Sequence, residues 1–193
     1  MNYHEKYGKQ ELKMERENIN SLLNKENYPL HESMRGFFGY ELYKAMAKDE
    51  SIFLISADLG YGLFNEHRIA FPERFLNTGA AEASAVGIAV GLAESGKIPI
   101  FYSITNFALY RPFETIRNYI DHEQIPVKII GGGRDKSYLH DGYSHWSEDA
   151  KMILDASFPN VTQYWPEEKE EMAEVVEEIL YNGKPTFLSL KRE

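Results

Sequence analysis

Glu82 is the only charged residue in a run of small and aliphatic side chains that covers residues 82–93. A helix that is apolar all round is typical of a buried segment, and Gly87 and Gly91 on one of its faces would let another backbone approach closely. We therefore expect Glu82 to lie at a packed interface, where a carboxyl group can share a proton with a ligand. The alternative is that Glu82 only complements the helix dipole in the first turn.

A second polar group, residues 140–149, follows three consecutive glycines at 131–133. The glycines lack the lysine and hydroxyl residue of a phosphate-binding loop, so we predict a flexible loop at the end of a strand. His140 and His145 could suggest a zinc site. That interpretation is poor, because their spacing crosses Gly142 and no third ligand is evident. Two histidines in a surface loop are the alternative.

Other candidate side chains stand next to predicted strands and helices. Asp58 directly follows the apolar run 51–57, and ligands in open α/β sheets bind beyond the carboxyl ends of such strands. An aspartate in a turn or helix cap is the alternative. Phe107 and Tyr110 could stack on a flat heterocycle, although such clusters also form ordinary core. Arg35 lies in a first helical turn, where the dipole does not favour a cation; an ordinary surface arginine is the alternative.

Short apolar strands alternate with helices along the chain, which predicts an α/β fold of three layers with a mostly parallel sheet flanked by helices. The predicted strands are 51–57, a short one before Glu82, 98–103, 127–131, 160–164 and 186–190. The predicted helices are 33–47, 82–93, 111–117, 150–156 and 165–181. Residues 1–29 are polar and predict one amphipathic helix, 9–25, that packs on the domain or on a partner.

The composition limits the class of protein. A chain of 193 residues with 43% hydrophobic and 26% charged residues suits one globular domain. The absence of cysteine excludes a disulfide scaffold, a cysteine nucleophile and a thiolate zinc site. A net charge of −9 argues against a nucleic-acid partner. We see no membrane-spanning run and no signal peptide, and we therefore expect a cytoplasmic protein without a membrane partner.

Several of these motifs together resemble the pyrimidine-binding domain of transketolases. The resemblance is carried by Asp58, Thr78-Gly79-Ala80-Ala81-Glu82, Gly87-Ile88-Ala89-Val90-Gly91-Leu92-Ala93, Gly96, Asn106-Phe107 and Asp141-Gly142-Tyr143-Ser144-His145. Residues 111–117 resemble the family's Arg-x-Phe-x-x-Ile-Arg helix. The resemblance implies the thiamine diphosphate-binding fold. We expect a helical extension over 1–29 and a pyrimidine-binding domain over 30–193.

The resemblance also implies roles for individual residues. In that family an acid at the position of Glu82 hydrogen-bonds the aminopyrimidine ring of thiamine diphosphate and favours the imino form, which removes the proton from the thiazolium carbon. Catalytic roles are implied for Glu82 and His145. Cofactor binding is implied for Asp58, Glu82, Phe107 and Tyr110. Substrate binding is implied for Arg35, Asp141, His145 and Arg192, with the arginines on a phosphate and Asp141 on hydroxyls. A basic residue near the terminus is the alternative for Arg192. No metal ligand is implied in this chain.

Transketolases also need a diphosphate-binding half with a Gly-Asp-Gly…Asn segment, and no such segment occurs in the sequence; the family's third domain is missing too. We therefore expect one subunit of a split transketolase, which transfers a two-carbon ketol unit from a ketose to an aldose. Its partner would be the diphosphate-binding subunit, which holds a divalent metal (Mg²⁺ or Ca²⁺). Symmetry favours a heterotetramer with two copies of each subunit.

The sequence departs from the transketolase pattern at two positions that would contact the substrate. Gly62 stands where the family has a phosphate-contacting serine, and the histidine expected near residues 131–133 is missing. We expect a phosphorylated or otherwise modified sugar. The nearest enzyme alternative is half of another thiamine diphosphate enzyme, of the 2-oxoacid dehydrogenase or deoxyxylulose-phosphate synthase type. A non-catalytic scaffold subunit is the other alternative. Residues 141–145 and 111–117 favour the transketolase.

Overall fold

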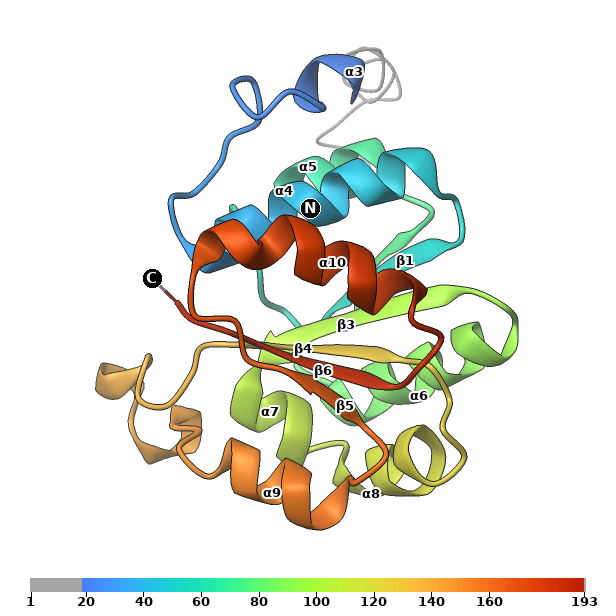
Figure 1. Ribbon diagram of the computed structural model, residues 1–193, viewed down its shortest axis with the longest axis vertical. Coiled ribbons are helices and arrows are strands. Elements are labelled where there is room, and N and C mark those ends of the chain that lie inside the picture. The colour runs from blue at the N-terminus through green and yellow to red at the C-terminus, as the bar shows by residue number, and fades with distance from the viewer. Residues whose placement is uncertain (1–18, 193) are drawn as a thin grey trace.

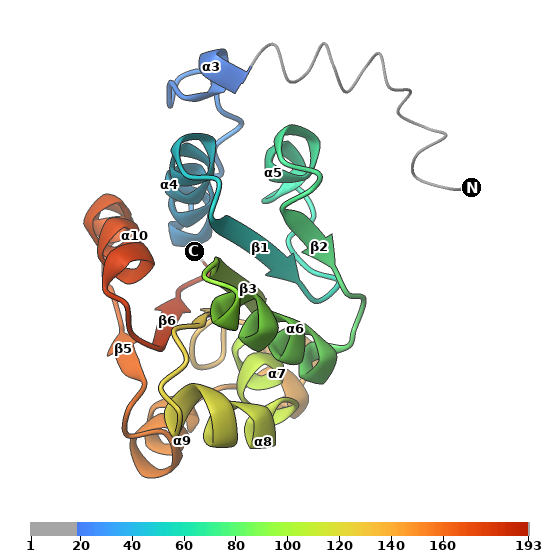
Figure 2. The ribbon, with the colours of Figure 1, turned by 90° about the vertical axis from the view of Figure 1, so that its right-hand side faces the viewer.

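The computed structural model describes residues 19–192, which form a parallel β-sheet between two layers of helices (Figures 1 and 2). The strands of this sheet are β1 (Ile52–Ser56), β2 (Phe75–Asn77), β3 (Ile98–Ile104), β4 (Lys128–Gly132), β5 (Thr162–Tyr164) and β6 (Thr186–Leu190). Their order is β2-β1-β3-β4-β6-β5, and every pair is parallel. The predicted α/β class with a mostly parallel sheet is confirmed.

The central strands are buried on both faces, as their continuous apolar sequences require. All five residues of β4 and of β6 are buried, and β3 is buried from Pro99 onward. In the register, Leu54 of β1 lies opposite Ile100 of β3, which in turn lies opposite Lys128 of β4. This packing aligns the carboxyl ends of the strands along one edge of the sheet.

The helices form the two outer layers. One layer consists of α4 (Met34–Lys48), α5 (Asn65–Ala70) and α10 (Met172–Tyr181). The other consists of α6 (Glu82–Glu94), α7 (Thr105–Tyr110), α8 (Phe113–Thr115), the π-helical turn η1 (Ile116–Asp121) and α9 (Ala150–Ser157). Each layer packs on its own hydrophobic cluster against the sheet. None of the helices within residues 19–192 is long and apolar enough to cross a membrane.

Most predicted elements are confirmed, with shifted ends. Ser33 caps α4, since its Oγ accepts a hydrogen bond from the Gly36 amide. The first part of the predicted helix 9–25 lies outside the described residues, and its described part contains only the short helix α3 (Ile19–Leu22) before a turn. The predicted helix 165–181 starts late: the 3₁₀ turn η4 (Lys169–Glu171) comes first, with Glu168 and Glu171 forming a capping box.

The prediction of a flexible glycine loop is wrong. Gly131 and Gly132 belong to β4 and are buried. A Cβ at Gly132 would lie 2.5 Å from the Tyr102 hydroxyl, and one at Gly131 would lie 2.6 Å from the Thr105 Oγ1. The glycines are therefore needed for the close approach of side chains from β3 and the start of α7, not for mobility.

The expectation that α6 is buried all round holds for only one of its faces. Ala85, Val86 and Ala89 are fully buried against the sheet. On the opposite face, Gly87, Ile88 and Gly91 are exposed, and a Cβ built on either glycine would meet nothing within 4 Å. The periodicity of the sequence did not distinguish these faces, because both consist of small or aliphatic residues.

Candidate functional site

The predicted site residues lie at the carboxyl edge of the sheet, on the segments that follow the strands. Asp58 follows β1, Phe107 lies on α7 directly after β3, and Arg192 follows β6. His145 ends the 3₁₀ turn η3 (Tyr143–His145), in the segment after β4. Ligands bind at this edge in open α/β sheets, so the fold places these residues where a site is expected.

Glu82 is the first residue of α6, and its side chain is only 2% exposed. Its Oε1 accepts hydrogen bonds from Arg111 Nη1 at 2.7 Å and from Ser103 Oγ at 3.4 Å. Its Oε2 is buried and has no hydrogen-bond partner among the described residues. A buried polar atom without a partner is energetically costly, so Oε2 is suited to a ligand that brings a donor.

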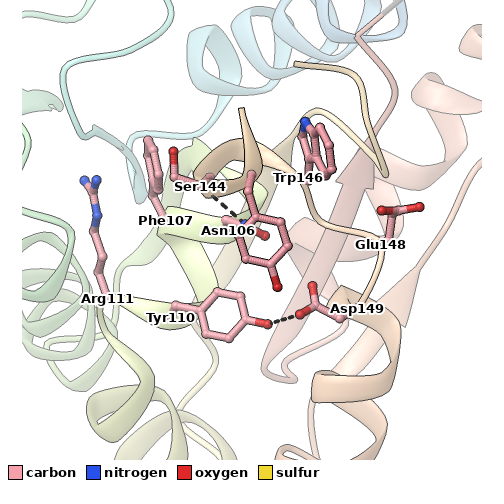
Figure 3. A pocket seen from close by; sticks show the side chains of 9 residues that line it. Asn106, Phe107, Tyr110, Arg111, Ser144, Trp146, Glu148 and Asp149 are labelled. Atoms are coloured by element: carbon pink, nitrogen blue, oxygen red, sulfur yellow. Dashed lines mark hydrogen bonds between the residues drawn. The ribbon is translucent and has the colours of Figure 1, made fainter. Parts of the chain in front are cut away.

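Phe107 lies between Arg111, which binds Glu82, and His145 of the polar group 140–149. The guanidinium carbon of Arg111 lies 3.7 Å from the centroid of the Phe107 ring, and Arg111 follows Phe107 by four residues (Figure 3). The His145 ring meets the Phe107 ring edge-on, with centroids 4.9 Å apart. Glu82, Arg111, Phe107 and His145 therefore form one continuous group of side chains, although they come from α6, from α7 and the residue that follows it, and from the segment after β4.

His145 is held in place by its neighbours. Its Nδ1 lies 3.0 Å from Ser144 Oγ, so that one ring nitrogen is engaged and Nε2 remains for another partner. The Ser144 carbonyl accepts a hydrogen bond from Asn106 Nδ2 at 3.2 Å (Figure 3). The Tyr138 ring lies on another side of the imidazole, with centroids 6.0 Å apart. These contacts orient the imidazole.

Arg35 and Arg192 meet around Tyr138. Arg35 Nη1 donates to the Tyr138 hydroxyl at 3.3 Å, and the Arg192 guanidinium lies 4.9 Å from the centre of the Tyr138 ring. Both arginines line a surface pocket of about 380 Å³, which also contains His31, Ser33 and Glu32, whose carboxylate pairs with Lys169. Two guanidinium groups facing one pocket are suited to an anionic group.

Tyr110 lies on α7 beside Phe107 and points toward Asp149 (Figure 3). Its hydroxyl donates a short hydrogen bond to Asp149 Oδ2 (Figure 3). Burial and this carboxylate raise the pKa of Tyr110 to about 12, so the phenol remains protonated. Tyr110, Phe107 and Arg111 share a pocket of about 570 Å³, with Trp146 on the opposite wall.

Two predicted site residues stand apart from this group. Asp58 has a left-handed backbone (φ 55°) and accepts a hydrogen bond from the Tyr61 hydroxyl at 2.8 Å, while its amide donates to Asn77 Oδ1. The Asp141 side chain is exposed, and its carboxylate has no hydrogen bond or ion pair within residues 19–192. The same part of the chain contains no cluster of three or more His, Asp or Glu residues that could hold a metal ion.

The sequence interpretation missed two residues. Arg111 was named only as part of a motif, yet it pairs with Glu82 across 29 positions. Its spacing of four residues from Phe107 was the available signal, because side chains with this spacing share a helix face. Tyr138 gave no signal, since a tyrosine in a polar loop has no distinctive pattern.

Known proteins match this chain over most of its length. Residues 32–193 match the family described as "Transketolase, pyrimidine binding domain". A putative transketolase C-terminal section from Methanocaldococcus jannaschii is 32% identical over 165 residues, which cover 84% of this chain and 52% of the relative. The 6-deoxy-6-sulfo-D-fructose transketolase subunit SqwH from Clostridium sp. is 29% identical over 146 residues, covering 75% of this chain and 45% of that protein.

A solved structure agrees with these sequence matches. It is described as a split gene transketolase, an inactive β4 tetramer, and it superposes with a TM-score of 0.73 at 28% identity. The match covers 83% of this chain and 52% of that chain. The chain thus spans about half the length of the curated relatives it matches.

Proposed function

This chain belongs to the transketolase pyrimidine-binding domain family, and on that premise we propose that it is one subunit of a split, thiamine diphosphate-dependent transketolase. The reaction would transfer a two-carbon ketol unit from a ketose, phosphorylated or otherwise modified, to an aldose. The relatives named as a transketolase section or subunit, and the split-gene structure, support this proposal. Within the chain we assign residues 1–29 to an extension and 30–193 to the pyrimidine-binding domain.

The observation that carries the proposal is the unpartnered, buried Oε2 of Glu82. An aminopyrimidine ring nitrogen is a partner of the right chemistry, because a carboxyl oxygen and a ring nitrogen can share one proton. Phe107 lies close to Glu82 through Arg111, and it would offer its aromatic face to the flat ring. Tyr110 would close the aromatic side of the pocket. These residues fit the pyrimidine half of thiamine diphosphate.

Thiamine diphosphate, when bound, supplies a carbon nucleophile for the ketone of the donor sugar. The work of this chain is to orient the pyrimidine and to handle protons. Glu82 would hold a proton at Oε2 against the ring nitrogen. His145, oriented by Ser144, would move a proton at a substrate hydroxyl through Nε2. Asp58 is the remaining proposed cofactor contact, from the end of β1.

The substrate would lie between His145 and the two arginines. We assign Arg35 and Arg192 to an anionic group of the sugar, because both line one pocket and both contact Tyr138. We assign Asp141 to substrate hydroxyls, since its carboxylate is exposed and could accept their hydrogen bonds.

A second chain would complete the enzyme. It would bind the diphosphate and hold the divalent metal, Mg²⁺ or Ca²⁺, and the assembly would be a heterotetramer with two copies of each subunit. The exposed face of α6 supports a partner at this position, because Gly87 and Gly91 leave room for another backbone and Ile88 is a large apolar side chain that is 41% exposed.

The test is turnover of the chain assembled with a diphosphate-binding chain, thiamine diphosphate and Mg²⁺. We expect Glu82→Gln to lower turnover by at least about 100-fold, the usual loss when a proton-transferring group is removed. Glu174→Gln, on the exposed side of α10 in the other helix layer, should leave turnover unchanged. Unchanged turnover in Glu82→Gln would reject the catalytic role and leave a scaffold subunit. We also expect faster turnover with a ketose donor than with pyruvate. Faster turnover with pyruvate would assign the chain to the deoxyxylulose-phosphate synthase or 2-oxoacid dehydrogenase type.

A further inference from the structure

Arg111 contacts the same carboxyl group and the same aromatic ring that the proposed function assigns to the aminopyrimidine, although it pairs with Oε1 of Glu82 and leaves Oε2 without a partner within residues 19–192. Its Nη1 donates to the buried Glu82 carboxylate at 2.7 Å. Its guanidinium carbon lies 3.7 Å from the centroid of the Phe107 ring, which is stacking distance. A guanidinium is flat, carries N–H donors along its edge and stacks well on aromatic rings. It therefore resembles an aminopyrimidine in its flat shape and its stacking, although it donates to Glu82 whereas the ring nitrogen would accept the carboxyl proton.

The two groups compete for the same surroundings. The Arg111 guanidinium lies beside the Phe107 ring (Figure 3), and its Nη1 donates to Glu82 Oε1. A pyrimidine that stacked on the face of Phe107 that Arg111 covers would overlap with the guanidinium. One of the two must leave.

We propose that Arg111 occupies the pyrimidine site in the unassembled chain and is displaced when the cofactor binds. The inference rests on the proposed function of Glu82 and Phe107. Displacement is feasible because Arg111 is attached through a long flexible stem and its side chain is already 43% exposed. The guanidinium would move into water, where it is well solvated, and the Glu82 carboxyl group would share a proton with the ring nitrogen instead of accepting a hydrogen bond from Arg111.

This arrangement makes cofactor binding depend on assembly. The chain by itself offers only the pyrimidine contacts, and these must first replace Arg111. A partner that binds the diphosphate adds affinity that offsets the displacement. The free subunit therefore keeps its buried acid paired, and the assembled enzyme opens the site.

The experiment uses the purified full chain and the ring alone, 4-amino-2,5-dimethylpyrimidine, as the probe. Binding is measured by titration in NMR spectra of ¹⁵N-labelled protein, in which the Arg111 Nε–H signal reports the position of the guanidinium. We expect the probe to shift this signal toward that of a solvated arginine. We expect Arg111→Ala to bind the probe at least about tenfold more tightly than the wild type, since a stacking and pairing competitor is removed.

Matched variants separate the possible explanations. Arg111→Lys keeps a charge beside Glu82 but cannot stack as a plane, so its affinity should lie between those of the wild type and Arg111→Ala. Arg117→Gln removes an exposed arginine whose side chain bonds only Asn118 among the described residues, and it should bind like the wild type. Glu82→Gln and Phe107→Ala should lose probe binding. Circular dichroism identifies any variant that fails to fold.

The results distinguish this inference from the proposed function. If Arg111→Ala binds the probe no more tightly than the wild type, while Glu82→Gln and Phe107→Ala lose binding, Arg111 is not a competitor and the inference is wrong, although the pyrimidine site stands. If neither the wild type nor Arg111→Ala binds the probe, and the assembled complex does not bind thiamine diphosphate, the inference falls together with the proposed function.

Discussion

His67 should make the fold sensitive to acid. It lies on α5 with no exposed surface, and its ring meets the Tyr43 and Phe64 rings edge-on at 5.5 and 5.2 Å. Neither ring nitrogen makes a well-formed hydrogen bond. Burial lowers the pKa of His67 to about 3, and the backbone of Gly39 offsets only part of this effect.

The direction in which stability changes with pH follows from how many protons the folded and unfolded states bind. The unfolded chain carries a histidine with a pKa of about 6.5, whereas the native His67 remains neutral down to about pH 3. Between these values the unfolded state binds more protons, so stability falls as the pH drops below about 6.5. From pH 7.5 to pH 5.0 this group should remove about 2 kcal/mol of the free energy of unfolding. This loss of about 2 kcal/mol is nearly the same for any native pKa well below 5.

The assay is urea denaturation of the wild type and of His67→Leu at pH 7.5 and 5.0. Leucine has a similar volume and does not titrate, so the variant should lose about 2 kcal/mol less than the wild type over this interval. His122→Gln is the control, because the His122 side chain is 80% exposed; it should lose as much as the wild type. Equal losses in the wild type and His67→Leu would show that His67 does not control this pH dependence.

Three further substitutions test packing and assembly, each by urea denaturation. Tyr110→Phe removes the hydrogen bond to Asp149 and should lower the free energy of unfolding by about 0.5–1 kcal/mol; no loss would mean that the bond is not formed in solution. Gly132→Ala places a methyl group 2.5 Å from the Tyr102 hydroxyl and should cost about 1–3 kcal/mol; a neutral effect would contradict the close approach. Gly87→Ala meets no atom within 4 Å and should stabilise the free chain by about 0.5–1 kcal/mol, yet weaken association with the diphosphate-binding chain in sedimentation experiments.

The sheet was predictable because its strands are short apolar runs with clear ends. β6 was predicted with its observed limits, and β1 to within one residue. Helix ends were harder to predict where local hydrogen bonds or a proline interrupt the regular helix. The capping box of Glu168 and Glu171 delays α10, and the Arg111-Pro112 step separates α7 from α8. Neither effect changes hydrophobic periodicity, so the pattern could not reveal it.

The candidate site was predictable only in part, because its contacts join residues that are distant in sequence. The motifs identified Glu82, Phe107 and His145, and the structure places them in one group through Arg111. A sequence pattern names residue types but does not say which atom faces which. Only the three-dimensional arrangement shows that Glu82 Oε1 pairs with Arg111 and that Oε2 lacks a partner within residues 19–192.

The two faces of α6 connect the sequence with the proposed assembly. The sequence predicts a helix buried all round, because residues 83–93 offer no polar face other than Ser84. The structure buries Ala85, Val86 and Ala89 but leaves the face of Gly87 and Gly91 exposed. A helix face that is exposed to water usually carries polar residues, and this face has almost none. The proposed assembly gives this face a role as one side of an interface. Glu82 begins the same helix, so a partner packed on α6 would lie next to the proposed pyrimidine site.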